Sequence, residues 1–235
     1  MPVFQLTDQV LFPPPELAEE SGLLAVGGDL SPRRLLAAYR LGIFPWYGEN
    51  DPLLWWFPSP RLVIFPTEFH SPRSLRRALR RTAPSLTINR AFEGVITSCA
   101  DVRRERGEQT WITPDMLAAY IDLHHRGYCH SVECWQGTAL VGGLYGLALG
   151  KVFFGESMFS RVTNASKFCL LHLVAFLQEN DYELLDCQMT TAHLQQFGAR
   201  EISAPHFLDL LKLLIPTTTY DSKWPHEKND RYGIV

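Results

Sequence analysis

The segment from residue 130 to residue 158, HSVECWQGTALVGGLYGLALGKVFFGESM, decides the fold, because its hydrophobic pattern repeats every two residues. It divides into the runs 130–135, 139–149 and 151–158, which Gln-Gly and Leu-Gly dipeptides separate. Alternation of this kind predicts β-strands, and short turns containing glycine predict that consecutive strands pair antiparallel. We therefore expect an antiparallel meander at the centre of the protein.

Helix signals flank the meander on both sides. Ser31 and Ser71 each precede a proline and apolar residues at helical spacing, and Thr113 precedes Pro114 in the same way, so all three are predicted N-caps. The predicted helices cover 31–41, 71–83, 91–104, 113–126, 164–180, 191–198 and 205–214, and further strands are predicted at 62–65, 85–90 and 183–189. This combination indicates an α+β fold with a mostly antiparallel sheet.

The first part of the chain differs in composition from the rest. Residues 11–61 are rich in Pro, Gly and Trp and contain one well-marked helix, with loops and short strands around it. This pattern predicts a small N-terminal domain, residues 1–62, that packs on a larger domain, residues 63–235.

The composition is typical of a globular protein with a substantial core. The 235 residues are 46% hydrophobic and 20% charged, and a formal net charge of −3 argues against nucleic-acid binding by the whole surface. Five cysteines without a CxxC pair indicate reduced thiols and a cytoplasmic protein. The chain shows no secretion signal and no apolar run long enough to cross a bilayer, so we expect no membrane association.

Most signatures of catalytic or metal chemistry are missing from the sequence. It contains no Walker loop and no Gly-x-Gly-x-x-Gly turn after a strand. Cys129, His130 and Cys134 match no zinc spacing, so no metal site is expected there. A thiol–imidazole pair of Cys187 and His193 is disfavoured, because strand alternation turns Cys187 away from the polar residues beside it.

Polar residues on apolar strands are the first functional signal. Asp186 and Gln188 would share one face of a predicted strand, and Glu156 lies on the last strand of the meander. A carboxylate is rarely buried without a partner. Under a structural interpretation, Asp186 bonds to backbone or to Arg161, and Glu156 pairs with Lys167 or Arg161. Under a functional interpretation, two acids and an amide form a reaction site. The pattern alone leaves both open.

An arginine-rich helix face is the second signal. No acidic residue occurs between Ser71 and Arg90. Such a face is either a solvated helix surface or a contact for a phosphate backbone, and exposed tryptophans would add surfaces on which bases stack. The arginines recur at helical spacings of three and four and comprise Arg73, Arg76, Arg77, Arg80 and Arg81.

Longer stretches of the chain resemble the bacterial leucyl/phenylalanyl-tRNA–protein transferases. They keep their order over nearly the whole chain, so chance agreement is negligible. The stretches are GLLAVGGDLSPRRLLAAYRLGIFPWY (22–47), LLWWFPSPR (53–61), TWIT (110–113), HSVECW (130–135), LVGGLYGLALGKVFFGESMFSRVTNASK (140–167) and LLDCQ (184–188) with the HL and FGA that follow it.

The resemblance implies a reaction, partners and a fold. Members of this family move Leu or Phe, and less readily Met, from aminoacyl-tRNA to the N-terminal Arg or Lys of an acceptor protein, which creates an N-end-rule degradation signal. The family is cytoplasmic, needs no metal or small cofactor, and is expected to act here as a monomer. Its larger domain is similar to the GNAT acyltransferases. The GNAT pyrophosphate loop is not visible in this chain, so the implied acyl donor is an aminoacyl ester and not acetyl-CoA.

The resemblance also implies roles for individual residues. Trp46 and Trp111 would hold the terminal adenosine of the tRNA, and the arginine-rich helix would meet the acceptor stem. Glu156, Asp186 and Gln188 would lie at the reacting centre. The apolar pocket for the Leu or Phe side chain would be lined by Leu144, Phe153, Gly155, Met158, Leu170, Leu173 and Leu185.

Two hypotheses describe how the polar residues would act. In the first, the Gln188 carbonyl accepts a hydrogen bond from the attacking amine while its NH₂ group bonds to the Asp186 carboxylate. In the second, Asp186 or Glu156 binds the positive side chain of the acceptor, and the tRNA ribose assists proton transfer. The chain departs from the family pattern at Thr191, which cannot supply the Asn amide found there in relatives.

Two other function classes remain compatible with parts of the sequence. One is a GNAT-type N-acetyltransferase, which would bind acetyl-CoA. The other is a tRNA-binding protein without catalytic activity. The paired acid and amide argue against the second class, because a protein that only binds needs no more than the basic face and the stacking rings.

Overall fold

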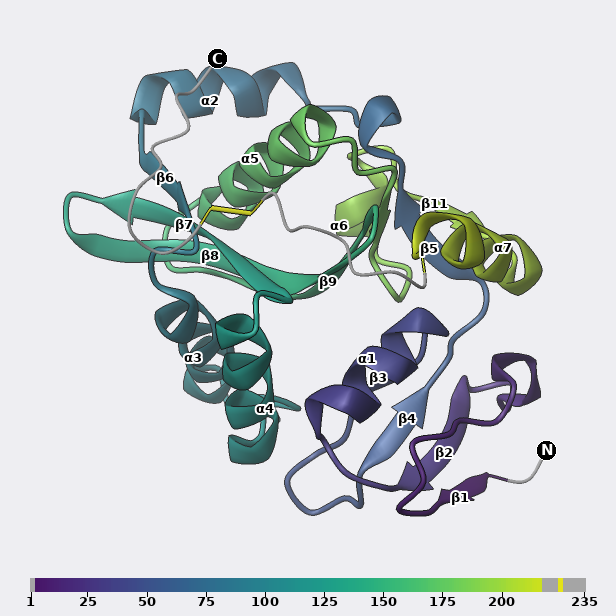
Figure 1. Ribbon diagram of the computed structural model, residues 1–235. Coiled ribbons are helices and arrows are strands. Elements are labelled where there is room, and N and C mark those ends of the chain that lie inside the picture. Colours follow the sequence, from purple (N-terminus) through teal and green to yellow (C-terminus); the bar gives the residue numbers. More distant parts are fainter. Residues whose placement is uncertain (1–2, 217–223, 226–235) are drawn as a thin grey trace.

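Two β-sheets of unequal size organise the chain (Figure 1), and the computed structural model describes residues 3–216 and 224–225. The smaller sheet has the order β1-β2-β4-β3, formed by β1 (Phe4–Leu6), β2 (Leu23–Gly27), β4 (Leu54–Trp56) and β3 (Phe44–Pro45). The 3-10 turn η1 (Pro15–Leu17) and helix α1 (Pro32–Arg40) complete this part. Residues 57–60 then lead from the smaller sheet into the larger one.

The larger sheet contains the predicted meander. Strands β7, β8 and β9 are antiparallel neighbours in chain order, which confirms the prediction from the two-residue period. The sheet has the order β11-β5-β10-β9-β8-β7-β6, formed by β11 (Arg200–Ile202), β5 (Arg61–Ile64), β10 (Leu184–Asp186), β9 (Val152–Ser160), β8 (Ala139–Leu149), β7 (Cys129–Gln136) and β6 (Ser85–Ile88).

The expectation of mostly antiparallel sheets is wrong, because both sheets are mixed. In the larger sheet β10 runs parallel to β9, and in the smaller sheet β2 runs parallel to β1. Helix α5 (Ala165–Glu179) connects β9 to β10, and a helical crossover of this length returns the chain in the same direction. The α+β class stands, with one parallel pair at the middle of the larger sheet.

The helices follow the predicted segments, and two of the three predicted N-caps are confirmed. The side chains of Ser31 and Thr113 accept hydrogen bonds from the N–H groups of Arg34 and Met116, as N-caps do. The prediction of Ser71 as an N-cap is wrong, because Pro72 keeps an extended backbone and takes the N-cap position without a side-chain hydrogen bond. The remaining elements are η2 (Pro66–Glu68), α2 (Arg73–Thr82), α3 (Phe92–Glu105), α4 (Pro114–His125), α6 (Ala192–Gln195) and α7 (Ala204–Leu214).

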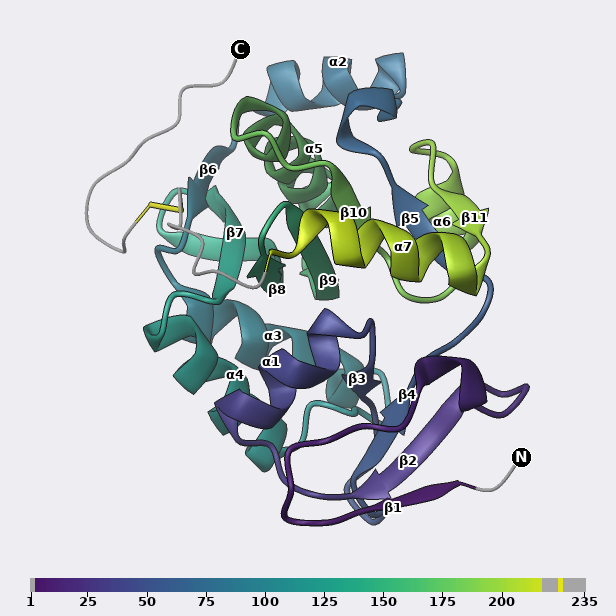
Figure 2. The same ribbon diagram turned by 45° about the vertical axis from the view of Figure 1, so that its right-hand side comes forward.

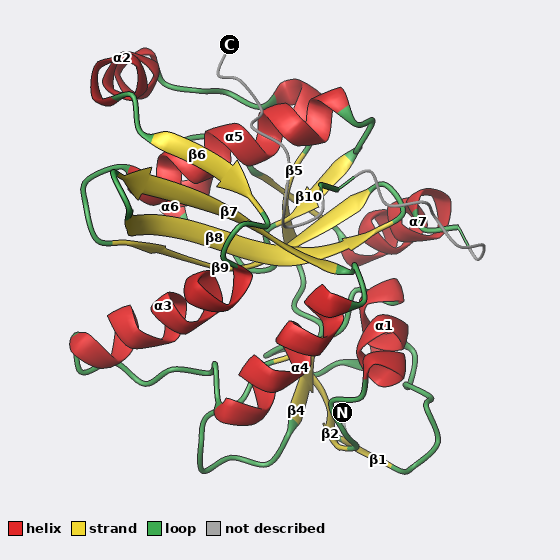
Figure 3. Cartoon of the chain, turned by 60° about the vertical axis from the view of Figure 1, so that its left-hand side comes forward, coloured by secondary structure: helices red, strands yellow, loops and turns green. Residues whose placement is uncertain are grey.

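Helices cover both faces of the larger sheet. Helix α5 lies on one face with α2 beyond it, while α3 and α4 lie on the other face beside α1 and the smaller sheet (Figure 3). Helix α7 lies beside β5, at the edge where the sheet faces the N-terminal part of the chain (Figure 2). Among the described residues, no helix has both the length and the hydropathy needed to cross a membrane.

Gly146 on β8 has no room for a side chain. A Cβ atom there would lie 2.2 Å from the Phe154 carbonyl oxygen and 2.5 Å from the ring of Phe153. Because overpacking of a core costs roughly 1–3 kcal/mol, we expect Gly146→Ala to lower the free energy of unfolding by that amount in urea denaturation. Gly155→Ala is the matched control, since its Cβ would meet no atom closer than 3.4 Å. Equal losses in the two variants would contradict this account.

Candidate active site

A cavity of about 330 Å³, called here the main cavity, lies where β9 and β10 cease to pair. The two strands are in register as far as Asp186 opposite Phe154. Strand β9 continues to Ser160, whereas the chain leaves the sheet after Asp186. The space between them is closed on one side by α5 and on the other by the chain after β3 of the smaller sheet. The main cavity therefore forms at the junction of the two sheets.

The apolar side of the main cavity contains the residues that the family resemblance implied. Strand alternation, a β-bulge at Glu156 on β9 and the helical stripe of α5 direct these side chains toward one space, although they come from four separate elements. All seven residues expected to form an apolar pocket line the main cavity: Leu144, Phe153, Gly155, Met158, Leu170, Leu173 and Leu185.

Trp46 and Trp111 also line the main cavity. Trp46 follows β3 and is 39% exposed, and Trp111 precedes α4 and is half-buried. Trp56 holds Trp46 in place: its indole N–H donates to the Trp46 carbonyl oxygen at 2.6 Å, and the two rings meet edge to face. Two partly exposed indoles beside one cavity can stack on a planar ligand.

Asp186 is fully buried and forms an ion pair with Arg61, the first residue of β5. The Arg61 Nε and Nη2 atoms donate to the two carboxylate oxygens at 2.8 and 2.7 Å. The guanidinium also donates to the Gly42 carbonyl oxygen and lies over the ring of Phe44. The prediction that Asp186 pairs with Arg161 is wrong, because Arg161 pairs with Glu105 on the surface.

Gln188 does not use its side chain to contact Asp186, so the geometry of the first hypothesis is wrong. The Gln188 backbone N–H donates to Asp186 Oδ1 at 2.9 Å, and the Gln188 Nε2 atom donates to Glu156 Oε1 at 3.1 Å. The reason is that β10 ends at Asp186 and Gln188 adopts a positive φ of 61°, so the alternation predicted for 183–189 stops after Asp186. The turn carries the amide toward β9.

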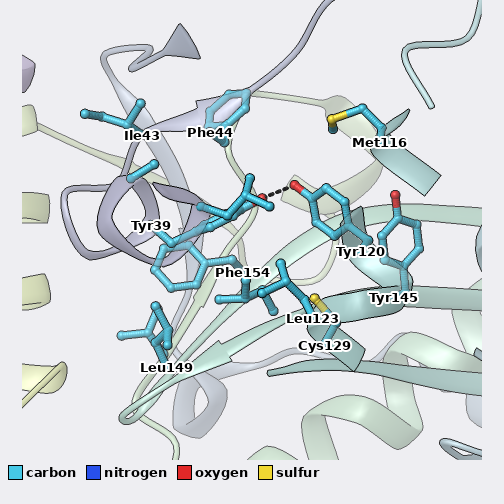
Figure 4. Close-up of a cluster of buried hydrophobic side chains, with 14 of the residues drawn as sticks. Tyr39, Ile43, Phe44, Met116, Tyr120, Leu123, Cys129, Tyr145, Leu149 and Phe154 are labelled. Atoms are coloured by element: carbon cyan, nitrogen blue, oxygen red, sulfur yellow. Dashed lines mark hydrogen bonds between the residues drawn. The ribbon is translucent and has the colours of Figure 1, made fainter. Parts of the chain in front are cut away.

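Glu156 is the centre of this hydrogen-bond network. Besides Gln188, the hydroxyl of Tyr39 on α1 donates to its Oε1 atom at 2.6 Å, and the hydroxyl of Tyr120 on α4 donates to Oε2 at 3.2 Å. Figure 4 shows the two hydroxyls also in contact with each other, within a cluster of buried apolar side chains. Because each hydroxyl has one proton, all three contacts are hydrogen bonds only when Glu156 is protonated and donates to one of the tyrosines. Neither Lys167 nor Arg161 is the partner that the structural interpretation expected.

Burial raises the pKa of Glu156 to about 7. Desolvation of the carboxylate is the largest cause, and the hydrogen bonds from Tyr39 and Tyr120 act against it by stabilising the ionised form. The nearby Asp186 charge raises this pKa and the Arg61 charge lowers it. A carboxyl group with a pKa near neutrality can both accept and release a proton under physiological conditions.

Cys187 packs with Leu185 against the α5-side cluster, whereas the Asp186 side chain meets Arg61 on the other side, as strand alternation predicted. Cys187 lines the main cavity together with His193. Burial raises the pKa of the Cys187 thiol far above its usual range, and burial lowers the pKa of His193. A thiol that stays protonated is a poor nucleophile, so the disfavoured thiol–imidazole pair gains no support.

Cys129, His130 and Cys134 do not converge on one point. They alternate along β7, with Cys129 packed in the cluster on the α3 side and Cys134 in the cluster on the α5 side. In the described part of the chain, no three His, Cys, Asp or Glu residues are arranged to hold a metal ion.

The arginines of α2 lie outside the main cavity. All five side chains are exposed, and no described residue forms an ion pair with any of them. A smaller hollow separates the start of α2 from Asn164 and Lys167 of the α5 region and from Gln196 after α6. Helix α6 itself contributes His193 and Leu194 to the main cavity. The basic helix is thus a neighbour of the cavity, with α6 between them.

The polar residues of the site that the sequence did not single out include Arg61, Tyr39, Tyr120 and Arg103. Tyr39 lies on the buried side of α1, where its ring packs against Phe154 while its hydroxyl reaches Glu156. Arg61 carried a detectable signal, because an arginine at the start of an apolar strand needs an acidic partner. Arg103 lines the main cavity from the last turn of α3. Thr191 also lines it and caps α6.

Comparisons with known proteins agree over most of the chain. The family model described as "Leucyl/phenylalanyl-tRNA protein transferase" matches residues 63–212, and the model of its N-terminal domain matches residues 28–59. A protein of Syntrophobacter fumaroxidans named "Leucyl/phenylalanyl-tRNA--protein transferase" is 59% identical over 227 residues, which cover 97% of each chain. A protein of Desulfotalea psychrophila with the same name is 54% identical and covers 95% of this chain and 99% of its own. The solved structure of L-PGS from Bacillus licheniformis is similar with a TM-score of 0.43 and 11% identity, covering 82% of this chain and 73% of that one.

Proposed function

The chain belongs to the leucyl/phenylalanyl-tRNA–protein transferase family, and on that premise we propose how its main cavity carries out the transfer. The protein is an aminoacyltransferase that moves an amino acid from aminoacyl-tRNA to the N-terminus of a protein. We assign Leu and Phe, and less readily Met, as the amino acids, and an N-terminal Arg or Lys as the acceptor. The observation that carries the assignment is one cavity that combines an apolar lining, two indoles and Glu156.

The donor occupies the main cavity in an extended arrangement. The Leu or Phe side chain fills the apolar end formed by β8, β9 and α5, where about 25 cal/mol is gained for each Å² of apolar surface removed from water. The terminal adenosine stacks against Trp46 and Trp111 at the opposite end. The ester then lies between the two ends, beside Gly155 and Glu156. The exposed arginines of α2 contact the acceptor stem of the tRNA.

Glu156 is the proton acceptor in this proposal. The neutral α-amino nitrogen of the acceptor attacks the ester carbonyl carbon, the new C–N bond forms, and the bond from that carbon to the ribose oxygen breaks. The nitrogen loses one proton to the Glu156 carboxylate, and the departing ribose oxygen receives one proton from it, so Glu156 returns to its starting state. A pKa of about 7 suits both transfers.

Gln188 orients the amine. An ionised carboxylate offers only hydrogen-bond acceptors, so the Gln188 amide nitrogen is the atom that faces Glu156. The amide oxygen is then turned away from Glu156 and carries no hydrogen bond from a described residue. It can accept one from the incoming amine, as the first hypothesis proposed, with Glu156 in place of Asp186 as the group that fixes the amide.

Asp186 acts as a positioning residue. Both of its oxygens are occupied by Arg61, and one of them also accepts the Gln188 N–H, so the carboxylate holds the turn that carries Gln188. This arrangement disfavours Asp186 as the group that binds a cationic acceptor side chain. Glu156 remains the candidate for that role under the second hypothesis, and steady-state kinetics separate acceptor binding from proton transfer.

Several coarser properties belong to the same proposal. We assign residues 1–62 to a small N-terminal domain and residues 63–235 to a GNAT-like catalytic domain, supported by the separate family models for residues 28–59 and 63–212. We also assign a cytoplasmic monomer that needs no cofactor and whose products carry an N-end-rule degradation signal. Size-exclusion chromatography with light scattering tests the monomer.

The direct test uses leucyl-tRNA labelled in the leucine and three peptides that begin with Arg, Lys or Ala. Transfer to the Arg and Lys peptides and not to the Ala peptide is the expected result. The same reaction with labelled phenylalanyl-tRNA and methionyl-tRNA gives the donor preference. Absence of transfer to the Arg and Lys peptides from every donor would overturn the proposal.

Tyr39→Phe should move the pH dependence of transfer to higher pH. The Tyr39 hydrogen bond lowers the pKa of Glu156, so its loss raises that pKa above about 7 and a higher pH is needed to ionise the carboxyl group. The measurement is the rate of single-turnover transfer against pH at saturating acceptor. Tyr128→Phe is the control, because its hydroxyl makes no hydrogen bond to a described residue. An unchanged midpoint of the pH profile in Tyr39→Phe would show that the Tyr39 hydroxyl does not affect the pKa of the group that titrates.

A further inference from the structure

A second cavity of about 340 Å³ adjoins the main cavity on the side of the smaller sheet. The two cavities have four lining residues in common: Trp46, Arg103, Trp111 and Met189. Gln109 and Thr110, just before Trp111, line only the second cavity, as do Leu54 and Trp56 of the smaller sheet. The boundary between the cavities is therefore formed by two indoles, a flexible apolar side chain and one guanidinium.

The guanidinium of Arg103 has no protein partner at this boundary. It is half-buried, and no described residue forms a hydrogen bond or ion pair with it. The acids close to it along α3 are engaged elsewhere: Asp101 pairs with Arg104 and Glu105 pairs with Arg161. Among the described residues that line either cavity, Arg103 is the sole Arg or Lys. The one acid on the described lining of the second cavity, Asp51, accepts the Gly48 N–H and forms no ion pair with Arg103. A half-buried cation without an ion pair at a cavity wall is suited to an anionic ligand.

The charges of the two cavities separate the possible ligands. Glu156 lies inside the main cavity and suits the cationic acceptor, whereas Arg103 lies at the boundary of the two cavities beside the indoles and would repel an acceptor that carries Arg or Lys. An anion bound between two indoles and next to a nucleoside is a phosphate of the donor RNA. The guanidinium fork offers two N–H groups that match the oxygens of a phosphodiester.

We propose that Arg103 binds the phosphate that joins the terminal adenosine of the donor to the preceding nucleotide. The inference rests on the proposed function, which places the adenosine at Trp46 and Trp111 and its aminoacyl ester toward Glu156. The 5′ side of the ribose then points away from the reacting centre, toward the boundary where Arg103 lies. The phosphate contact fixes the distance between the stacked base and the ester, and so places the ester for attack.

The test compares two small donors that differ by one phosphate. One is the leucyl ester of adenosine and the other is the leucyl ester of adenosine 5′-phosphate, each supplied with a peptide that begins with Arg. A charge-assisted contact of this kind corresponds to roughly a 10- to 100-fold gain in kcat/KM. We expect the phosphorylated donor to show that gain with the wild-type protein and to lose it in Arg103→Gln. Arg103→Lys should recover part of the gain, because it keeps the charge but not the fork.

Arg104→Gln is the matched control, since Arg104 is the next residue of α3 and its guanidinium is exposed and paired with Asp101. It should keep the full preference for the phosphorylated donor. The proposed phosphate site would be contradicted if Arg103→Gln lowered kcat/KM equally for both donors. It would also be contradicted if the wild-type protein showed the same kcat/KM for both. Failure of the proposed function is distinct: it would appear as no transfer from either donor, or from leucyl-tRNA, with any variant.

Discussion

Glu156→Gln should lower the single-turnover rate of transfer by roughly 10²- to 10⁴-fold, the range in which a positioned general base contributes. The amide keeps the size of the carboxyl group and can still accept a hydrogen bond from Tyr39, but it cannot take a proton from the amine. The wild-type rate should rise with pH through about 7, because the carboxyl group is protonated below that pH and ionised above it. In Glu156→Gln this rise should disappear, leaving the ionisation of the acceptor amine, whose ordinary pKa is about 8.

Two measurements make this prediction specific. Glu133→Gln is the control, because Glu133 likewise has a pKa raised by desolvation and is fully buried, but lines no part of the main cavity. Its rate and its pH profile should match those of the wild-type protein. If Glu156→Gln raised the KM for the acceptor peptide and left kcat unchanged, Glu156 would bind the cationic acceptor and another group would take the proton.

The same pKa has a consequence for stability. The Glu156 carboxyl group has a raised pKa in the folded protein and a value near 4.5 when unfolded, so the folded state binds the proton more tightly. Its contribution to stability is complete below about pH 4.5 and is lost as the pH rises to about 7. Compared with wild type, Glu156→Gln should therefore lose less stability between pH 4.5 and 7, as measured by urea denaturation across that range.

Arg61→Met should have the largest effect on the fold. The substitution leaves the Asp186 carboxylate buried without its cation, and removal of one partner of a buried ion pair costs about 3–5 kcal/mol. For a chain of this size that loss lowers the melting temperature by roughly 6–20 °C. Urea denaturation measures the free energy directly, and transfer activity should fall with it, because the turn that carries Gln188 loses its anchor.

Arg126→Met provides the comparison for a surface pair. Arg126 pairs with Asp122 at 3.0 Å with both side chains largely exposed, and such pairs contribute about 0–1 kcal/mol. The double variant Arg61→Met/Asp186→Leu removes both buried charges and should recover part of the stability lost in Arg61→Met. Equal unfolding midpoints for Arg61→Met and Arg126→Met would show that the buried pair does not support the fold.

Much of the candidate site could be predicted from the sequence, partly from local pattern and partly from the family resemblance. The apolar lining was implied by the family resemblance, and those residues do line one cavity, although a β-bulge at Glu156 is needed to bring Met158 to the face of Phe153. The acids and the amide could be singled out because polar groups are rare on apolar strands. Their contacts could not be predicted in the same way. Gln188 adopts a left-handed backbone conformation, which ends the strand alternation. Its side-chain amide therefore bonds to Glu156 and not to Asp186.

What the amino-acid sequence determined by itself is therefore local: the meander from its two-residue period, the starts of α1 and α4 from Ser31 and Thr113, and the family from long ordered stretches. The tertiary structure alone decided which groups meet. Asp186 found Arg61 across 125 positions of the chain, and Glu156 found Tyr39 and Tyr120 on two helices outside its sheet. Propensity and periodicity act over a few residues, whereas the pKa of a buried carboxyl group depends on burial and on neighbours brought together by the order of the strands.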